Sequence, residues 1–282
     1  MSIQALPEAP PEELRFHFGF HFIRWARELW QSRELVRTLT ERELRSRYKQ
    51  ASLGYAWAVI TPVIFMVVFS VFFKRVAKVP THGAPYELFS YLGLLPWTFF
   101  SSSMSQGASS LITSKMLLNR IYCPREVFPL SNVAVAAVDT TIATLILGLL
   151  FVIKGRAPHM ETLWLPVILA VQVAFTVGLT ICASGVMIYL RDVRYGLPLV
   201  LQLGLFATPV AYGIEVIPKA ARTVYAAANP LAGVITSYRT TILYGHPPAW
   251  DLLVPGAITS AAMLVLGYVA FKRMEVGFAD IA

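Results

Sequence analysis

The chain has 282 residues, of which 56% are hydrophobic and only 14% are charged, and its mean hydropathy is +0.59. Because soluble domains carry about a quarter charged residues, this composition excludes an ordinary soluble protein and predicts an integral membrane protein. The net charge of +8 could attract nucleic acid, but most cations lie between apolar stretches or near the N-terminus, where a membrane explains them. We therefore expect membrane lipids, and no nucleic acid, as partners.

The N-terminal part of the chain is polar and has two expected regions. Residues 1–20, rich in proline and glutamate, predict a disordered tail. Residues 21–53 predict cytoplasmic amphipathic helices, because apolar residues recur at spacings of three and four beside arginines. The first fifty residues hold no apolar region of a cleavable signal peptide, so we expect the N-terminus to stay in the cytoplasm.

The second of these helices has a predicted start and two predicted ion pairs. Thr40, followed three residues later by Glu43, resembles a capping box. Glu41 with Arg45, and Glu43 with Arg47, have the spacing of pairs along a helix. We expect this cationic helix to run almost continuously into the first membrane helix, so that a push on it would move the membrane part. Alternatively, the basic stretch only anchors that helix at anionic headgroups.

Six apolar stretches are long enough for membrane helices, which need about 20 residues each. Most of the 24 lysines and arginines lie on the side of the N-terminus, so the positive-inside rule predicts that both termini are cytoplasmic. The expected fold is therefore an all-α membrane protein whose six transmembrane helices are Tyr55 to Phe73, Leu88 to Ile112, Val127 to Ile153, Leu163 to Leu190, Gly196 to Tyr212 and Leu252 to Phe271.

The segment between the fifth and sixth stretches is too polar to span and too apolar for a free loop. It contains two short helical patterns, Ala220 to Ala228 and Leu231 to Leu243, with a turn at Asn229-Pro230. We expect a re-entrant helical hairpin on the outer side, since such a segment is tolerated at membrane depth where it packs on protein.

Several intramembrane side chains are candidates for function. Asp139 lies mid-way along the third stretch and could contact a substrate in a pore, or form an interhelical hydrogen bond. Aromatic residues on or near the first and fifth stretches could stack on sugar rings, or could contact only lipid and protein. Tyr212 also suits an interfacial aromatic belt. The channel candidates are Tyr55, Trp57, Phe65, Phe69, Asp139, Phe206 and Tyr212.

The sequence has no recognisable enzymatic site. It lacks the Gly-x-x-x-x-Gly-Lys-Ser/Thr loop that binds ATP phosphates. The five histidines are scattered, without the i, i+4 spacing of a metal-binding helix, and the two cysteines are single. We therefore expect no catalytic residue, no metal and no cofactor in this chain.

Five segments carry a resemblance to a known family: LGYAWAVITPVIFMVVFSVFF, YLGLLPWTFFSSSM, NRIYCPREVFPLSNV, YLRDVRYGLPLVLQLGLFATPVAY and NPLAGVITSYRTTIL. In this order they are similar to the signatures of those ABC transmembrane type 2 permeases that export lipid-linked polysaccharides such as O-antigen, capsule, teichoic acid and galactan. The resemblance covers about Arg33 to Ala282, and it implies that residues 54–282 form the type 2 transmembrane domain.

The resemblance implies a homodimer bound to two copies of a separate ABC ATPase, which would hold ATP and Mg²⁺. A channel between the two copies, lined by the first and fifth membrane helices, would export a polyprenyl-linked polysaccharide across the bacterial inner membrane. Gate residues would be Arg42, Arg45 and Arg47 on the cytoplasmic helix, with Asn229 and Pro230 at the outer mouth. ATPase coupling residues would be Lys115, Asn119, Arg120, Arg125, Arg191, Asp192 and Arg194.

Two alternatives stay open. A type 2 permease for a drug or a simple lipid would need no aromatic channel walls, so leucine could replace Tyr55 and Phe206. A polytopic glycan-modifying enzyme, such as an acyltransferase or ligase, would need an acid, a base or a metal site. His82, His159 and His246 in the outer loops are its candidates.

Overall fold

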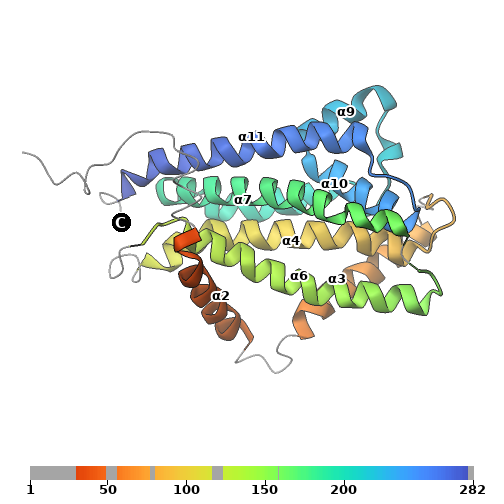
Figure 1. The fold of residues 1–282 in the computed structure, drawn as a ribbon, viewed down its shortest axis with the longest axis horizontal. Helices are drawn as coiled ribbons and strands as arrows, with labels where there is room; N and C mark the ends of the chain where they lie inside the picture. The colour runs from red at the N-terminus through yellow and green to blue at the C-terminus, as the bar shows by residue number, and fades with distance from the viewer. Residues whose placement is uncertain (1–29, 49–55, 77–79, 116–122, 158, 279–282) are drawn as a thin grey trace, which may run out of the picture.

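The computed structural model describes residues 30–48, 56–76, 80–115, 123–157 and 159–278 (Figure 1). Within these ranges every regular element is a helix, which confirms the predicted all-α class. The predicted tail, the first cytoplasmic helix and the junction with the first membrane helix lie outside the described residues. We call the end of the bundle at which the last helix finishes the inner end, and the opposite end the outer end.

All six apolar stretches form helices. Helix α6 has the predicted bounds, whereas the fifth helix ends five residues before Tyr212. The helices are α3 (Ala56–Phe69), continued by the π-helix η2 (Ser70–Val76), α4 (Tyr86–Thr113), α6 (Val127–Ile153), α7 (Leu165–Tyr189) after the 3₁₀ helix η3 (Met160–Trp164), α8 (Val193–Ala207) and α11 (Trp250–Glu275).

Three of these pieces are long and apolar enough to cross a membrane, namely α6, η3 with α7, and α11. Two apolar helices are shorter. One is Val59–Phe73, which comprises most of α3 and the start of η2, and the other is Val193–Ala207, which is α8. The described part of the chain therefore fits a multi-pass membrane protein, and the count of six spans stays a prediction.

Helix α4 is the centre of the bundle. It packs against α6 and α7, and α11 packs against the other side of α7, so that these four helices run lengthwise beside one another (Figure 1). Leu88, Tyr91, Leu92 and Leu94 of α4 are at most 1% exposed and lie in the largest apolar cluster. Helices in lipid gain little from apolar burial itself, so close packing has to hold them together.

Two glycines bring the backbones of α7 and α11 into close contact. A Cβ on Gly178 would lie 2.5 Å from the Cα of Leu264, and a Cβ on Gly267 would lie 2.2 Å from the carbonyl oxygen of Gly178. Real side chains do not fit at such distances, so only glycine lets the two backbones touch. Small residues of this kind are the usual basis of tight helix contacts in membranes.

Helix α2 (Arg33–Tyr48) packs on α6 and begins seven residues before the predicted cap. The capping-box prediction is therefore wrong. Thr40 lies inside the helix, where its hydroxyl donates to the Val36 carbonyl at 2.7 Å and is 3.4 Å from the Ser131 carbonyl of α6. A threonine that bonds back to residue i−4 satisfies its hydroxyl without ending a helix.

The outer end holds the predicted helical pair. Helix α9 (Lys219–Ala228) and helix α10 (Pro230–Tyr238) meet at Asn229, and the π-helix η5 (Arg239–Leu243) continues α10. Pro230 opens α10 at a position where the missing N–H costs no hydrogen bond. The 3₁₀ helix η4 (Ile214–Val216) precedes the pair. The two helices and their turn are confirmed, and their re-entry into a membrane stays a prediction.

Candidate functional site

Helix α2 is bonded to the middle of α6 by a polar cluster around Asp139. The guanidinium of Arg47 donates to Asp139 Oδ2 at 2.8 Å, and the hydroxyl of Tyr48 donates to Asp139 Oδ1 at 2.7 Å. Arg47 also donates to the side-chain oxygen of Gln106 on α4. Burial, followed by the adjacent Asp139 carboxylate, raises the pKa of Tyr48 to about 12, so its hydroxyl stays a donor.

This cluster bears on the second of the two interpretations of Asp139, and the substrate contact stays a prediction. Its carboxylate forms the interhelical bonds of that interpretation, and its partners Arg47 and Tyr48 come from α2. The pairing also corrects one prediction about Arg47, which binds Asp139 rather than Glu43. The other predicted pair is present, with Arg45 and Glu41 4.0 Å apart on the exposed face of α2. A membrane carboxylate thus neutralises a cation of α2.

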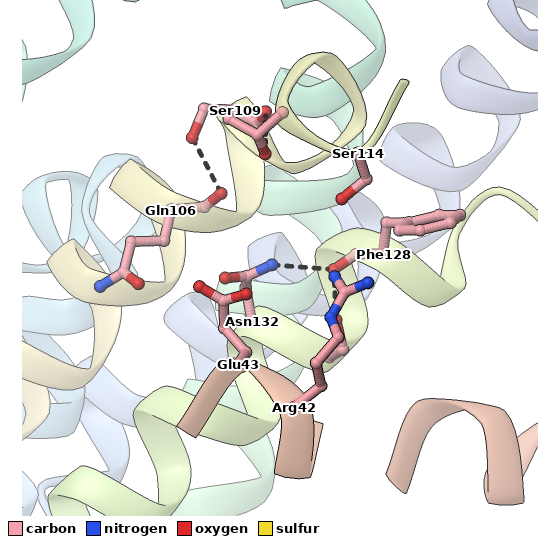
Figure 2. Close-up of a pocket in the computed structure, with 9 residues that line it drawn as sticks. Arg42, Glu43, Gln106, Ser109, Ser114, Phe128 and Asn132 are labelled. Carbon is pink, nitrogen blue, oxygen red and sulfur yellow. Dashed lines mark hydrogen bonds between the residues drawn. The ribbon is translucent and has the colours of Figure 1, made fainter. Parts of the chain in front are cut away.

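Two cavities flank the cluster. The first, of about 240 Å³, lies where α2 crosses α4 and α6 near the inner end. Figure 2 shows Arg42 and Glu43 of α2 facing Asn132 of α6, with Gln106 and Ser109 on α4. Most of its lining side chains carry an amide, hydroxyl or charged group.

The second cavity, of about 300 Å³, reaches from the cluster to the first membrane helix. Arg47, Tyr48 and Asp139 line it together with Trp57 and Thr61 of α3. Trp57 is the one channel candidate that the described structure brings to this cavity beside Asp139. Tyr55 lies outside the described residues.

The remaining aromatic candidates lie on two loosely covered helices. On α3, Phe65 is 41% exposed, whereas Phe69 is buried in the core and meets Phe65 edge to face. On α8, none of the 15 residues is buried, and Phe206 is 58% exposed. Tyr212, beyond the end of α8, donates its hydroxyl back to the Phe206 carbonyl at 2.9 Å. The faces of α3 and α8 are thus open to lipid or to another protein.

The inner connections converge on the end of α11. Arg125 donates to the Glu275 carbonyl at 3.3 Å, and its guanidinium lies over the ring of Phe278. Tyr189, just before the exposed residues Arg191, Asp192 and Arg194, donates to the Met274 carbonyl at 2.7 Å. Lys115 is exposed, and Asn119 and Arg120 lie outside the described residues. The two predicted coupling segments are therefore tied to the same helix end.

The buried acid Glu126 secures this region. It is 1% exposed and pairs with Lys272 of α11 at 2.9 Å, which in turn pairs with Glu275 at 2.8 Å. Burial raises the pKa of Glu126, although the ammonium of Lys272 works in the opposite direction. Sequence analysis missed this cluster, since it joins residues nearly 150 positions apart in the chain.

The predicted gate residues separate into two groups. Arg42 and Arg45 are exposed on α2, while Arg47 is held in the cluster. At the outer end, Pro230 is buried, and the amide of Asn229 donates to the Thr208 hydroxyl at 2.9 Å, just after α8 ends. The outer turn thus contacts the end of a predicted channel helix.

Arg239 is the other residue that sequence analysis missed. It is 3% exposed at the outer end, where it donates to backbone carbonyls. The sequence does contain a signal for Arg239, namely a single cation within the apolar run VITSYRTTIL. A cation within such a run is a candidate functional residue if the run lies in a membrane.

The histidines of the enzyme alternative lie in the outer connections. The rings of His82 and Tyr244 are 6.1 Å apart, and the ring of His159 lies beside Gly245. His246 is exposed. Among the described residues, no three His, Cys, Asp or Glu side chains are grouped so that they could hold a metal ion.

Comparison with known proteins decides the family. The model of the family described as ABC-2 type transporter matches residues 34–243, about three quarters of the chain. The chain belongs to the ABC-2 type transporter family. The match begins in α2 and ends with η5, so it includes the Asp139 cluster and both helices of the outer pair.

Individual members of the ABC-2 family match nearly end to end. The O-antigen export system permease protein RfbA of Myxococcus xanthus is 31% identical over 256 residues, which cover 90% of this chain and 97% of that protein. A protein of the same name from Klebsiella pneumoniae is 29% identical over 249 residues, covering 88% and 95%. The polysialic acid transport protein KpsM of Escherichia coli is 23% identical over 245 residues, covering 85% and 93%.

Proposed function

We propose that this ABC-2 family member is the membrane permease of a polysaccharide exporter. Two copies would form the channel, and two copies of a separate ABC ATPase would bind ATP and Mg²⁺ and drive transport. The substrate would be a polyprenyl-linked polysaccharide of O-antigen type, crossing the bacterial inner membrane through six spans per copy, with both termini in the cytoplasm. The outer helical pair would enter the membrane at the mouth of this channel.

The observation that carries this proposal is the similarity to O-antigen export permeases over nearly the full length of both chains. The relatives named for polysialic acid transport are less similar, at 23% and 22% identity. The absence of a phosphate-binding loop in the sequence agrees with a permease whose ATPase is a separate protein.

Two exposed helix faces suit a channel between two copies. About half or more of the side chain is exposed for Ile64, Val67 and Val68 on α3, for Phe72 on η2, and for Leu199, Val200, Leu203 and Phe206 on α8. In this proposal a second copy and the glycan cover part of these faces, and lipid covers the rest. Phe65 and Phe206 would then offer flat apolar rings to passing sugars.

The Asp139 cluster supplies a physical route for coupling. Closure of the ATPase pair would move the inner connections and α2, and the bonds from Arg47 and Tyr48 would carry this displacement to the middle of α6. Coupling of this kind requires a rigid contact between two elements that each have two positions. The charged helix then works as a mechanical link, which is a larger role than anchoring to headgroups.

The decisive experiment measures ATP hydrolysis in nanodiscs by this chain, alone and co-purified with an ABC ATPase from the same bacterium, with and without a polyprenyl-linked glycan. We expect hydrolysis only in the complex and a change in its rate with the glycan. A complex that responds to simple lipids or drugs but not to the glycan would favour the other type of permease.

Matched substitutions separate the same possibilities. Replacement of Phe206 by leucine should slow glycan export, because a branched aliphatic side chain cannot stack on a sugar ring. The control Leu203→Val changes an exposed apolar side chain on the same helix and should leave export unchanged. A chain that co-purifies with no ATPase, and loses its activity when His82, His159 and His246 are all replaced by alanine, would be an enzyme instead.

A further inference from the structure

Helix α8 ends early, and its backbone continues without regular structure. Its 15 residues extend about 22 Å, less than the roughly 30 Å of a bilayer core. The carbonyl groups that follow Ala207 therefore need partners other than the next turn of a helix. In a membrane an unpaired carbonyl is costly, so irregular backbone is tolerated only where the protein itself supplies donors.

The structure supplies a donor for every carbonyl from Phe206 to Tyr212. Arg239 donates to three of them, Pro209 at 2.8 Å, Val210 at 2.6 Å and Tyr212 at 2.9 Å. The other four carbonyls are also paired. Tyr212 donates to Phe206, Tyr225 to Ala207, the Val210 amide to Thr208, and Tyr86 to Ala211.

Arg239 also ties this segment to the central helix. Its Nε–H donates to the Phe89 carbonyl of α4 at 3.1 Å, and its guanidinium carbon lies 3.6 Å from the centre of the Phe89 ring. The ion pairs of the described residues do not include Arg239. The four carbonyl oxygens to which Arg239 donates carry partial negative charge, and they stabilise the cation instead.

Only an arginine fits this arrangement. A guanidinium is a planar fork with five N–H donors, and four of the bonds described above radiate from it to carbonyls of two different segments. Lysine would place all its donors on one nitrogen and could not reach Phe89 and Val210 together. The surroundings are shaped for the fork as well, because a Cβ on Gly93 would lie 2.5 Å from the Val210 carbonyl and 2.6 Å from Arg239 Nη2.

We propose that Arg239 is a positioning residue that fixes the outer end of α8 to α4, and with it Phe206 and Tyr212. This inference rests on the proposed function in one respect, namely that α8 lines the channel. The anchoring itself follows from the contacts of the described residues. Leu197, Leu201 and Leu205 of α8 are only partly buried against the core, and the hydrogen bonds beyond Ala207 fix the outer end of the helix.

Hydrogen exchange in nanodiscs tests the anchor without any transport assay. Replacing Arg239 by lysine should speed exchange of the amides between residues 206 and 216 by about tenfold or more, the effect of losing one charge-assisted hydrogen bond. Exchange in α7 should stay unchanged. The control is Arg156→Lys, an exposed arginine that donates to the Gly83 carbonyl at 3.0 Å and should alter neither segment.

A second variant, Gly93→Ala, keeps the charge but pushes the Val210 carbonyl away. It should speed exchange in the same 206–216 segment. If Arg239→Lys speeds exchange throughout the bundle, the result for Gly93→Ala decides whether this segment is anchored locally. Unchanged exchange of this segment in both variants would overturn the proposal.

The positioning role adds a readout on the ATPase complex. Both variants should keep the basal rate of ATP hydrolysis and lose most of the change in this rate that the glycan causes. A general loss of stability would instead lower the basal rate as well as the glycan response. Equal glycan responses in wild type and variants would refute the positioning role. If the wild-type complex ignores the glycan, the proposed function fails, and hydrogen exchange alone then decides whether Arg239 is the anchor.

Discussion

The ion pair between Arg47 and Asp139 provides a quantitative test of the link between α2 and α6. Asp139→Asn keeps the shape of the side chain and still accepts from Tyr48, but it leaves Arg47 without a carboxylate. The two side chains are only 24% and 19% exposed, so solvent screens them less than a surface pair. A charge-assisted hydrogen bond contributes about 1.5–3 kcal/mol. We expect a loss of about 2 kcal/mol.

A double-mutant cycle measures this contact directly. Thermal unfolding in nanodiscs would compare wild type, Asp139→Asn, Arg47→Met and the double variant. For a chain of this size, about 2 kcal/mol corresponds to roughly 4–8 °C in Tm, and we expect a coupling energy of about 1–2 kcal/mol. The control Arg37→Met removes a pair with Glu41 whose side chains are 73% and 50% exposed, and it should cost at most about 0.5 kcal/mol.

Additive effects of Asp139→Asn and Arg47→Met would refute the reasoning, because two residues in contact cannot be independent. The same variants probe function when the ATPase is present. A link between α2 and α6 predicts that Asp139→Asn leaves ATP hydrolysis in place but lowers the export achieved for each ATP. Unchanged export per ATP would restrict the pair to a structural role.

Three further predictions follow from contacts at the ends and seams of the bundle. Gly267→Ala should separate α7 from α11 and cost about 1–3 kcal/mol, measured as Tm, whereas Gly148→Ala has open space and should leave Tm equal or slightly higher. Burial raises the pKa of Glu126 above its ordinary value of 4.5, so the folded state binds this proton more tightly than the unfolded state does. The resulting stabilisation is present below pH 4.5 and is lost as the pH rises through the raised pKa. Glu126→Gln should flatten this part of the profile of Tm against pH, and an unchanged profile would contradict the assignment. Arg191→Glu, on an exposed connection, should reduce the amount of ATPase that co-purifies, with little change in Tm. Co-purification of as much ATPase as with wild type would show that this connection does not contact the ATPase.

Hydropathy locates the six apolar helices because the boundaries of apolar stretches are chemically sharp. Helix α6 matches its predicted bounds since the acid Glu126 precedes it and the pair Lys154-Gly155 follows it. The turn at Asn229-Pro230 is equally local, because proline fixes its own backbone and restricts its neighbour. Signals of this kind need no knowledge of the rest of the fold.

The contacts that build the site are long-range, and the sequence could not supply them. Arg47 has an acid four residues away, as a helix pair requires, yet it binds Asp139, 92 residues further along the chain. Thr40 has the spacing of a cap, but packing against Ser131 keeps it inside a helix. Arg239 lies within the predicted helical pattern Leu231 to Leu243, which gives no sign that its partners lie in α4 and beyond the end of α8. In each case tertiary packing overrides a local rule.

The glycine contact between α7 and α11 limits how the molecule can change shape. Two backbones that touch cannot slide or rotate without collision, because no flexible side chain lies between them to adjust. Helix α4 packs against α7 along its length, so α4, α7 and α11 form one rigid unit. Helices α2, α3, α6 and α8 lie outside this unit, and conformational freedom belongs to them, because they are attached by side-chain packing and polar contacts. Any opening of a passage through the protein is then a displacement of these four helices against the frame of α4, α7 and α11.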